Sequence, residues 1–155
     1  MIKTQLAAPT IRAEPLCEYQ SDREIKADEL TWKAHKRLLD TLHCHGNAQA
    51  REQQEANRAV LNLYSCMALG LVHGRWAVPL ATGAGKTASA IAWISELILS
   101  GNREISVTLC SNTVEALCDI KRALISNGVD PSLIGLAHTY RYDSEKAKDY
   151  LDGKT

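Results

Sequence analysis

Seven consecutive residues have the types and spacing that could do a particular chemistry: Ala81, Thr82, Gly83, Ala84, Gly85, Lys86 and Thr87. The two glycines let a backbone approach an anion and adopt dihedral angles closed to other residues. A helical pattern begins near Lys86, so backbone N–H groups and the positive end of a helix dipole would face a phosphate. Lys86 can reach the β- and γ-phosphates, and the Thr87 hydroxyl can ligate Mg²⁺. The pattern therefore predicts a site for ATP or GTP.

The position of Leu80 narrows this prediction. The fully spaced pattern G-x-x-x-x-G-K-[ST] requires a glycine there. The chain instead resembles superfamily-2 helicases and translocases, whose motif I, A-x-x-G-x-G-K-T, does not require that glycine; its G-x-G-K-T part coincides with residues 83–87, and its alanine falls on Leu80. The resemblance covers 81–87 closely and the order of elements from about Val60 onward more loosely. It implies that residues 81–87 bind ATP, with Lys86 as the catalytic lysine at the phosphates and Thr87 holding Mg²⁺.

The elements that must position this loop are expected helices and strands in alternation. Apolar residues at helical spacing predict helices over 21–43, 48–73, 86–98, 112–125 and 144–151. Ser21 and Glu24 are spaced as a capping box at the first of these, and Asn112 is expected to cap the fourth. Short apolar or β-branched runs predict strands over 76–78, 105–110 and 133–137.

This order of elements indicates an α/β fold with a parallel sheet, as in a P-loop NTPase of the RecA-like, three-layer kind. We expect residues 1–47 to form an arm and a helix, and residues 48–155 to form a partial ATP-binding domain. The alternation is unfinished at the last residue, which favours the N-terminal part of a larger motor domain.

A second set of residues follows the expected strand over 105–110. The resemblance places Ser111, Asn112 and Thr113 where these helicases have motif Ia, a turn that contacts the phosphate backbone of DNA or RNA. Helix capping by Asn112 is the alternative, and both roles are compatible. The resemblance also implies an adenine-reading glutamine ahead of the loop, for which Gln49, Gln53 and Gln54 qualify by location. A polar helix surface also explains these glutamines.

Composition bounds the partners and the compartment. Lys+Arg and Asp+Glu balance at 18 each, so a nucleic acid would have to be held by local contacts. The five cysteines are odd in number and irregularly spaced, which favours reduced thiols in a cytoplasmic protein. No signal peptide is evident, and no run approaches the roughly 18 apolar residues of a membrane span.

Hydrolysis requires a carboxylate that holds the metal and orients water, and the sequence after Thr87 has no apolar run that ends in Asp-Glu. We therefore expect the chain as given to bind nucleotide without turning it over. Two other functions remain open: a different P-loop NTPase, such as a nucleotide kinase or GTPase, and a non-catalytic remnant that serves as an interaction module.

Overall fold

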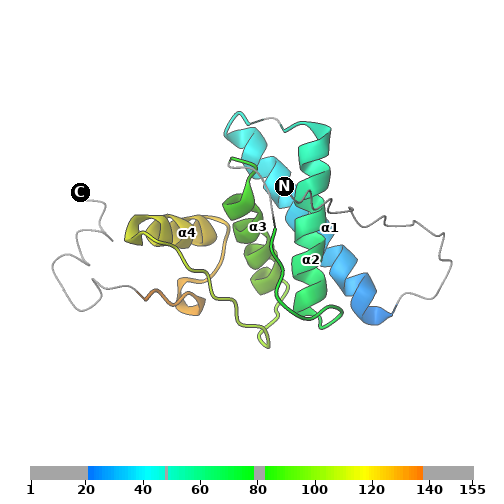
Figure 1. Cartoon of the computed structure of the whole chain (residues 1–155). Helices are drawn as coiled ribbons and strands as arrows, with labels where there is room; N and C mark the ends of the chain where they lie inside the picture. Colours follow the sequence, from blue (N-terminus) through cyan, green and yellow to red (C-terminus); the bar gives the residue numbers. More distant parts are fainter. Residues whose placement is uncertain (1–20, 48, 79–82, 138–155) are drawn as a thin grey trace, which may run out of the picture.

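The computed structural model describes residues 21–47, 49–78 and 83–137 as a set of helices joined by irregular segments (Figure 1). The helices in these ranges are α1 (Asp22–Cys44), α2 (Arg51–Ala68), α3 (Lys86–Leu99), α4 (Val114–Ser126) and a 3-10 turn, η1 (Pro131–Leu133). The helix predicted over 144–151 lies outside the described residues. None of the described helices combines the length and apolarity needed to cross a membrane.

The boundaries of α1 follow from its own sequence. The Ser21 hydroxyl accepts a hydrogen bond from the Glu24 amide, and the Glu24 carboxylate accepts one from the Ser21 amide at 2.6 Å. This reciprocal pair is the predicted capping box, and it satisfies donors that a helix start leaves unpaired. After Cys44 the chain turns at Gly46 with φ of 72°, a left-handed conformation that favours glycine.

The core forms where α3 is covered on two sides. α1 and α2 pack against α3 and against each other, and α4 packs against α3 (Figure 1). Leu38 of α1 and Leu61 of α2 are fully buried, and Trp93 of α3 and Leu124 of α4 join the same cluster. A helix that is apolar around most of its circumference requires this double coverage.

A buried serine joins three helices inside this core. Ser65 of α2 is fully buried, and its hydroxyl donates to the Leu61 carbonyl at 3.0 Å. The same oxygen accepts from Trp93 Nε1 at 3.1 Å and lies 3.0 Å from Thr31 Oγ1 of α1. Each polar atom therefore has a partner, so the cluster fixes the relative position of the helices without leaving a desolvated group unpaired.

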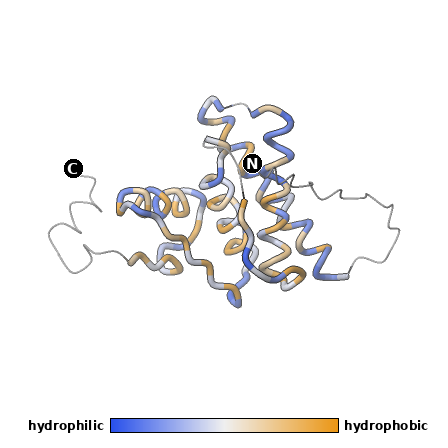
Figure 2. Tube along the Cα trace, viewed as in Figure 1, coloured by the Kyte–Doolittle hydropathy of each residue, from blue (hydrophilic) through white to orange (hydrophobic). Residues whose placement is uncertain are grey.

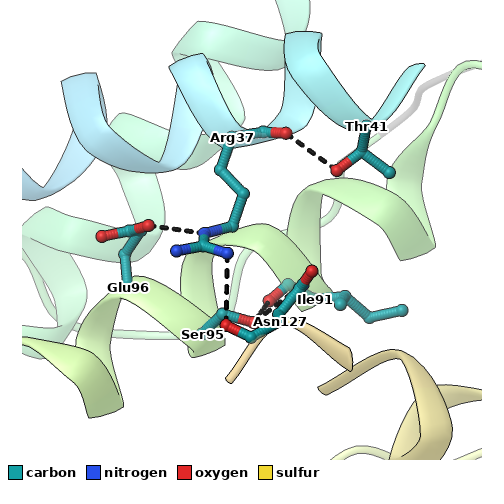
Figure 3. Close-up of polar contacts among 6 residues, drawn as sticks. All are labelled: Arg37, Thr41, Ile91, Ser95, Glu96 and Asn127. Atoms are coloured by element: carbon teal, nitrogen blue, oxygen red, sulfur yellow. Dashed lines mark hydrogen bonds and ion pairs between the residues drawn. The ribbon is translucent and has the colours of Figure 1, made fainter. Parts of the chain in front are cut away.

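A second polar network, drawn in Figure 3, ties α1 to the far side of α3. The Arg37 guanidinium pairs with Glu96 and also donates to the Asn127 carbonyl at 3.3 Å. Asn127 in turn donates through Nδ2 to Ser95 Oγ at 3.1 Å. Asn127 follows the last residue of α4, so the network links α1, α3 and the end of α4.

The parallel sheet predicted from the sequence is wrong for the described residues, which contain no β-strand. Residues 105–110 are irregular and largely exposed, residues 75–78 make no ladder, and the run over 133–137 begins inside η1. Short β-branched runs favour extended backbone, but a ladder also requires a partner strand far away in sequence. Here α1, α2 and α4 occupy the two covered sides of α3, so a three-layer α/β architecture is absent from this part of the chain.

Candidate functional site

The start of α3 is a glycine turn that leads directly into a helix. Gly83 and Gly85 have φ of 81° and 88°, in the left-handed region, and Gly85 is the N-cap residue. No side chain caps the helix at this end, although the Ser89 amide donates to the Gly85 carbonyl at 2.8 Å and so closes the first turn. The two glycines were predicted for this geometry, and the helix begins at the predicted residue.

The two residues expected to contact phosphate and metal come first in α3. Lys86 and Thr87 are both exposed, whereas Ala84 just before them is buried. Ala84 thus packs into the protein interior, while the side chains of Lys86 and Thr87 are exposed to solvent. An exposed ammonium and hydroxyl beside a helix N-terminus can together hold an anion and a hydrated metal ion. Leu80, Ala81 and Thr82 lie outside the described residues.

Two side-chain amides that precede or belong to α2 lie against this turn. A Cβ atom added to Gly85 would lie 3.4 Å from Gln49 Nε2 and 3.6 Å from Asn57 Nδ2. Asn57 Nδ2 donates to Gln49 Oε1 at 2.9 Å, and the Gln54 side chain donates to the Gln49 carbonyl at 2.9 Å. Of the three glutamines considered from the sequence, Gln49 is therefore the one that the fold places beside Gly85.

Asn57 is a residue that the sequence analysis missed. It is fully buried on α2, one turn before the buried Val60 and Leu61, so it occupies a position of the apolar stripe. An amide at such a position is the signal that could have identified it, because buried polar groups are the informative exceptions in a core. Because the apolar face of α2 packs against α3, Asn57 on that face lies beside the glycine turn.

Two buried side-chain atoms without hydrogen-bond partners belong to residues at or beside the N-terminal end of α3. In the described ranges, three buried side-chain atoms lack a partner: His35 Nε2, Asn57 Oδ1 and Ser89 Oγ. Ser89 is in the first turn and a half of α3, and Asn57 lies beside Gly85. Buried polar atoms without partners are uncommon and call for an explanation such as a functional role. Two of the three therefore belong to residues in the first turns of α3 or beside Gly85.

The residues predicted to contact nucleic acid lie at the start of α4. Thr113, rather than Asn112, caps this helix: its hydroxyl accepts from the Ala116 amide at 3.2 Å. Ser111 is half-buried and its hydroxyl lies 3.5 Å from the Thr113 amide, while Asn112 is exposed. The prediction of an Asn112 cap is wrong by one residue. Figure 1 shows that α4 begins well away from the upper end at which α3 begins, so the two predicted sites are separate.

Comparisons with known proteins give no match for this chain: no protein-family model, no curated protein and no solved structure is similar to it.

Proposed function

We propose that this chain binds ATP with Mg²⁺ at the turn before α3 and is the ATP-binding segment of a nucleic-acid-dependent ATPase of the helicase or translocase type. The observation that carries the proposal is the geometry of the turn. Gly83 and Gly85 both adopt left-handed dihedrals immediately before a helix whose first two residues are exposed Lys86 and Thr87. This combination supports anion binding through backbone N–H groups and the helix dipole.

The two side chains distinguish a nucleoside triphosphate from a simple anion. The Lys86 ammonium supplies a positive charge within reach of the terminal phosphates. The Thr87 hydroxyl is a hard oxygen donor, which suits Mg²⁺ as one ligand among water and phosphate oxygens. Bound Mg²⁺ would neutralise phosphate charge at the site. Sequence spacing and an open helix start thus favour the same class of ligand.

Lys86 supports binding rather than turnover in the chain as given. Phosphoryl transfer to water needs a carboxylate that holds the metal and orients the nucleophile. No apolar run that ends in Asp-Glu follows Thr87 in the sequence. We therefore expect nucleotide binding without measurable hydrolysis, and a steady release of phosphate that Lys86→Ala abolishes would contradict this part of the proposal.

The test is calorimetric or fluorescence titration of the purified chain with ATP and a ribose-labelled fluorescent ATP, in the presence and absence of Mg²⁺. Lys86→Ala should weaken binding by about tenfold or more, which corresponds to about 1.4 kcal/mol. Thr87→Val should remove the part of the affinity that depends on Mg²⁺. The matched control is Lys26→Ala, which removes an equally exposed lysine from α1 and should leave affinity unchanged.

The outcomes separate the alternatives. Equal loss of affinity in the Lys26 and Lys86 variants would show non-specific attraction of the anion to positive charge, and the proposal would fail. Competition by GTP as strong as that by ATP would favour another NTPase class. A labelled single-stranded DNA or RNA oligonucleotide tests the nucleic-acid part: Asn112→Ala should weaken its binding, because Asn112 is exposed and is not the cap of α4.

A further inference from the structure

The segment between α3 and α4 carries a row of backbone groups without partners. Asn102 Oδ1 accepts from the amides of Glu104 and Ile105 at 3.0 and 3.1 Å, which fixes where the segment begins. From Ser106 to Cys110 no backbone N–H or C=O group is hydrogen-bonded to another residue within the described ranges. Figure 1 shows this stretch as an extended trace that runs from the end of α3 to the start of α4. Such a row is a template for a further strand.

One side of this segment is already supported by helices. Ile105 and Leu109 are half-buried and pack against the core cluster. A cavity of about 650 Å³ lies between the segment, α3, α4 and residues 133–137, with mainly aliphatic side chains around it. Two-stranded ribbons are marginal alone but become stable when a helix packs on one face. In a single chain, α3 and α4 already pack on one face of the segment.

Residues 105–109 of one copy match the same residues of a second copy in polarity and charge. Ile105, Val107 and Leu109 alternate with Ser106 and Thr108, and no charged residue, proline or glycine occurs from Ile105 to Thr113. Val107 is 41% exposed, and much of the trace is coloured hydrophobic in Figure 2. Uncharged stretches of high β propensity, with no proline and few glycines, are the ones that pair with their own copies.

Among the antiparallel registers that pair apolar with apolar side chains, only the one centred on Val107 pairs all five residues from Ile105 to Leu109. If two copies pair about Val107, then Val107 lies opposite Val107, Ile105 lies opposite Leu109, and Ser106 lies opposite Thr108. A shift of one residue would put apolar side chains opposite polar ones on the wrong face. The register about Val107 also leaves α3 and α4 of both copies on the same face of the ribbon, because alternate residues share a face.

We propose that two copies of this chain associate through residues 105–109 as an antiparallel two-stranded ribbon centred on Val107. The partner is a second copy because an uncharged, alternating segment matches itself in both polarity and charge. The two-fold axis passes through the Val107 pair, so the contact closes and the assembly stops at a dimer. This ribbon forms between chains and differs from the parallel sheet within one chain that the structure excludes from its described part. The inference does not depend on nucleotide binding.

The first test is the mass of the full chain in solution, measured by size-exclusion chromatography with light scattering over a range of concentrations. The mass should rise from 17.0 kDa toward twice that value. Val107→Lys should keep the chain monomeric, because it places two lysines opposite each other on the axis. An equimolar mixture of Val107→Lys and Val107→Glu should restore the dimer. Ile125→Lys, a matched change at an exposed apolar residue of α4, should dimerise as the original chain does.

The second test reads the register by disulfide formation. Cys17, Cys44, Cys66 and Cys110 are replaced by serine, and the buried Cys118 is kept. Under mild oxidation Val107→Cys should cross-link with its own copy, whereas Thr108→Cys, which faces Ser106, should not. Far-UV circular dichroism checks that the variants keep their helices. A mass of one chain at every concentration, a dimer that survives Val107→Lys, or a cross-link at 108 in place of 107 would each overturn the proposal.

Discussion

Asn57 Nδ2 donates a hydrogen bond to Gln49 Oε1 at 2.9 Å, and both amides lie against Gly85 at the start of α3. The bond joins a residue of α2 to one just before it, and the pair lies beside the glycine turn. It makes the position of the turn depend on a fully buried side chain of another helix. Gln49 and Asn57 are therefore expected to support nucleotide binding by holding the glycine turn in place.

Replacing Asn57 by leucine is expected to separate binding from stability. The change removes one hydrogen bond, a loss of about 1 kcal/mol, but it also removes the unpartnered Oδ1 atom from the interior. The melting temperature should therefore change little while ATP affinity falls, because Gln49 and Gly85 lose their support. Thermal melts and calorimetric titration measure the two effects. Asn62→Leu, on an exposed face of the same helix, is the control, and an equal loss of affinity there would contradict the idea.

The positive φ angles of Gly83 and Gly85 predict backbone strain in any substituted residue. Gly83→Ala and Gly85→Ala should each lower the free energy of unfolding by about 1–2 kcal/mol, because an L-residue at φ of 81° or 88° is strained. An added methyl group at Gly83 meets no atom within 4 Å, so strain alone acts there. Gly135→Ala also meets open space but has no positive φ, and chemical denaturation should show no change for it. Equal costs at all three positions would rule out the strain argument.

The Arg37–Glu96 ion pair should contribute more than the surface pairs. Its two side chains are 27% and 15% exposed, against 88% and 64% for Arg51 and Glu55. Arg37→Ala leaves a largely buried carboxylate without its partner and is expected to cost about 2–3 kcal/mol. Arg51→Ala should cost less than about 0.5 kcal/mol, because an exposed pair is screened by water. Urea denaturation of both variants checks this, and similar costs would argue that the partial burial of Glu96 has no energetic role.

His35 predicts a loss of stability in mild acid. Burial, and next the positive charge of Arg58, lower the pKa of His35, and its Nε2 atom is buried without a partner. The unfolded chain then binds the proton more tightly than the folded one, so stability is full above the ordinary histidine pKa of about 6.5 and falls as the pH drops below it. The pKa values of Glu24 and Glu29 are also lowered, but their effect is lost only at more acidic pH.

Melting temperatures at about pH 7.5 and about pH 5.5 bracket the histidine transition and stay above the carboxylate range. The original chain should be less stable at the lower pH, and His35→Gln should reduce that difference. His73→Gln, at an exposed position after α2, should leave the difference in place. A pH response that is unchanged in the His35 variant would assign it to another group.

The sequence alone determined the features that depend on neighbours along the chain. The capping box at Ser21 and Glu24 and the start of α3 at Lys86 appear as predicted, and the left-handed turn at Gly46 is equally local. Each depends on residues a few positions apart, whose conformational preferences and hydrogen bonds are local. Even there the cap of α4 moved from Asn112 to Thr113, since either side chain can accept the hydrogen bond of a nearby helix amide.

Tertiary structure decided which distant residues meet. The β-branched run over 105–110 was predicted to be a strand and is not one, because a strand needs a partner and the described chain supplies none. Likewise, no local pattern places Asn57 and Gln49 beside Gly85, because that contact arises only when the stripe of α2 packs toward α3. Pairing and packing join residues far apart in sequence, so their energies are absent from any short window of residues.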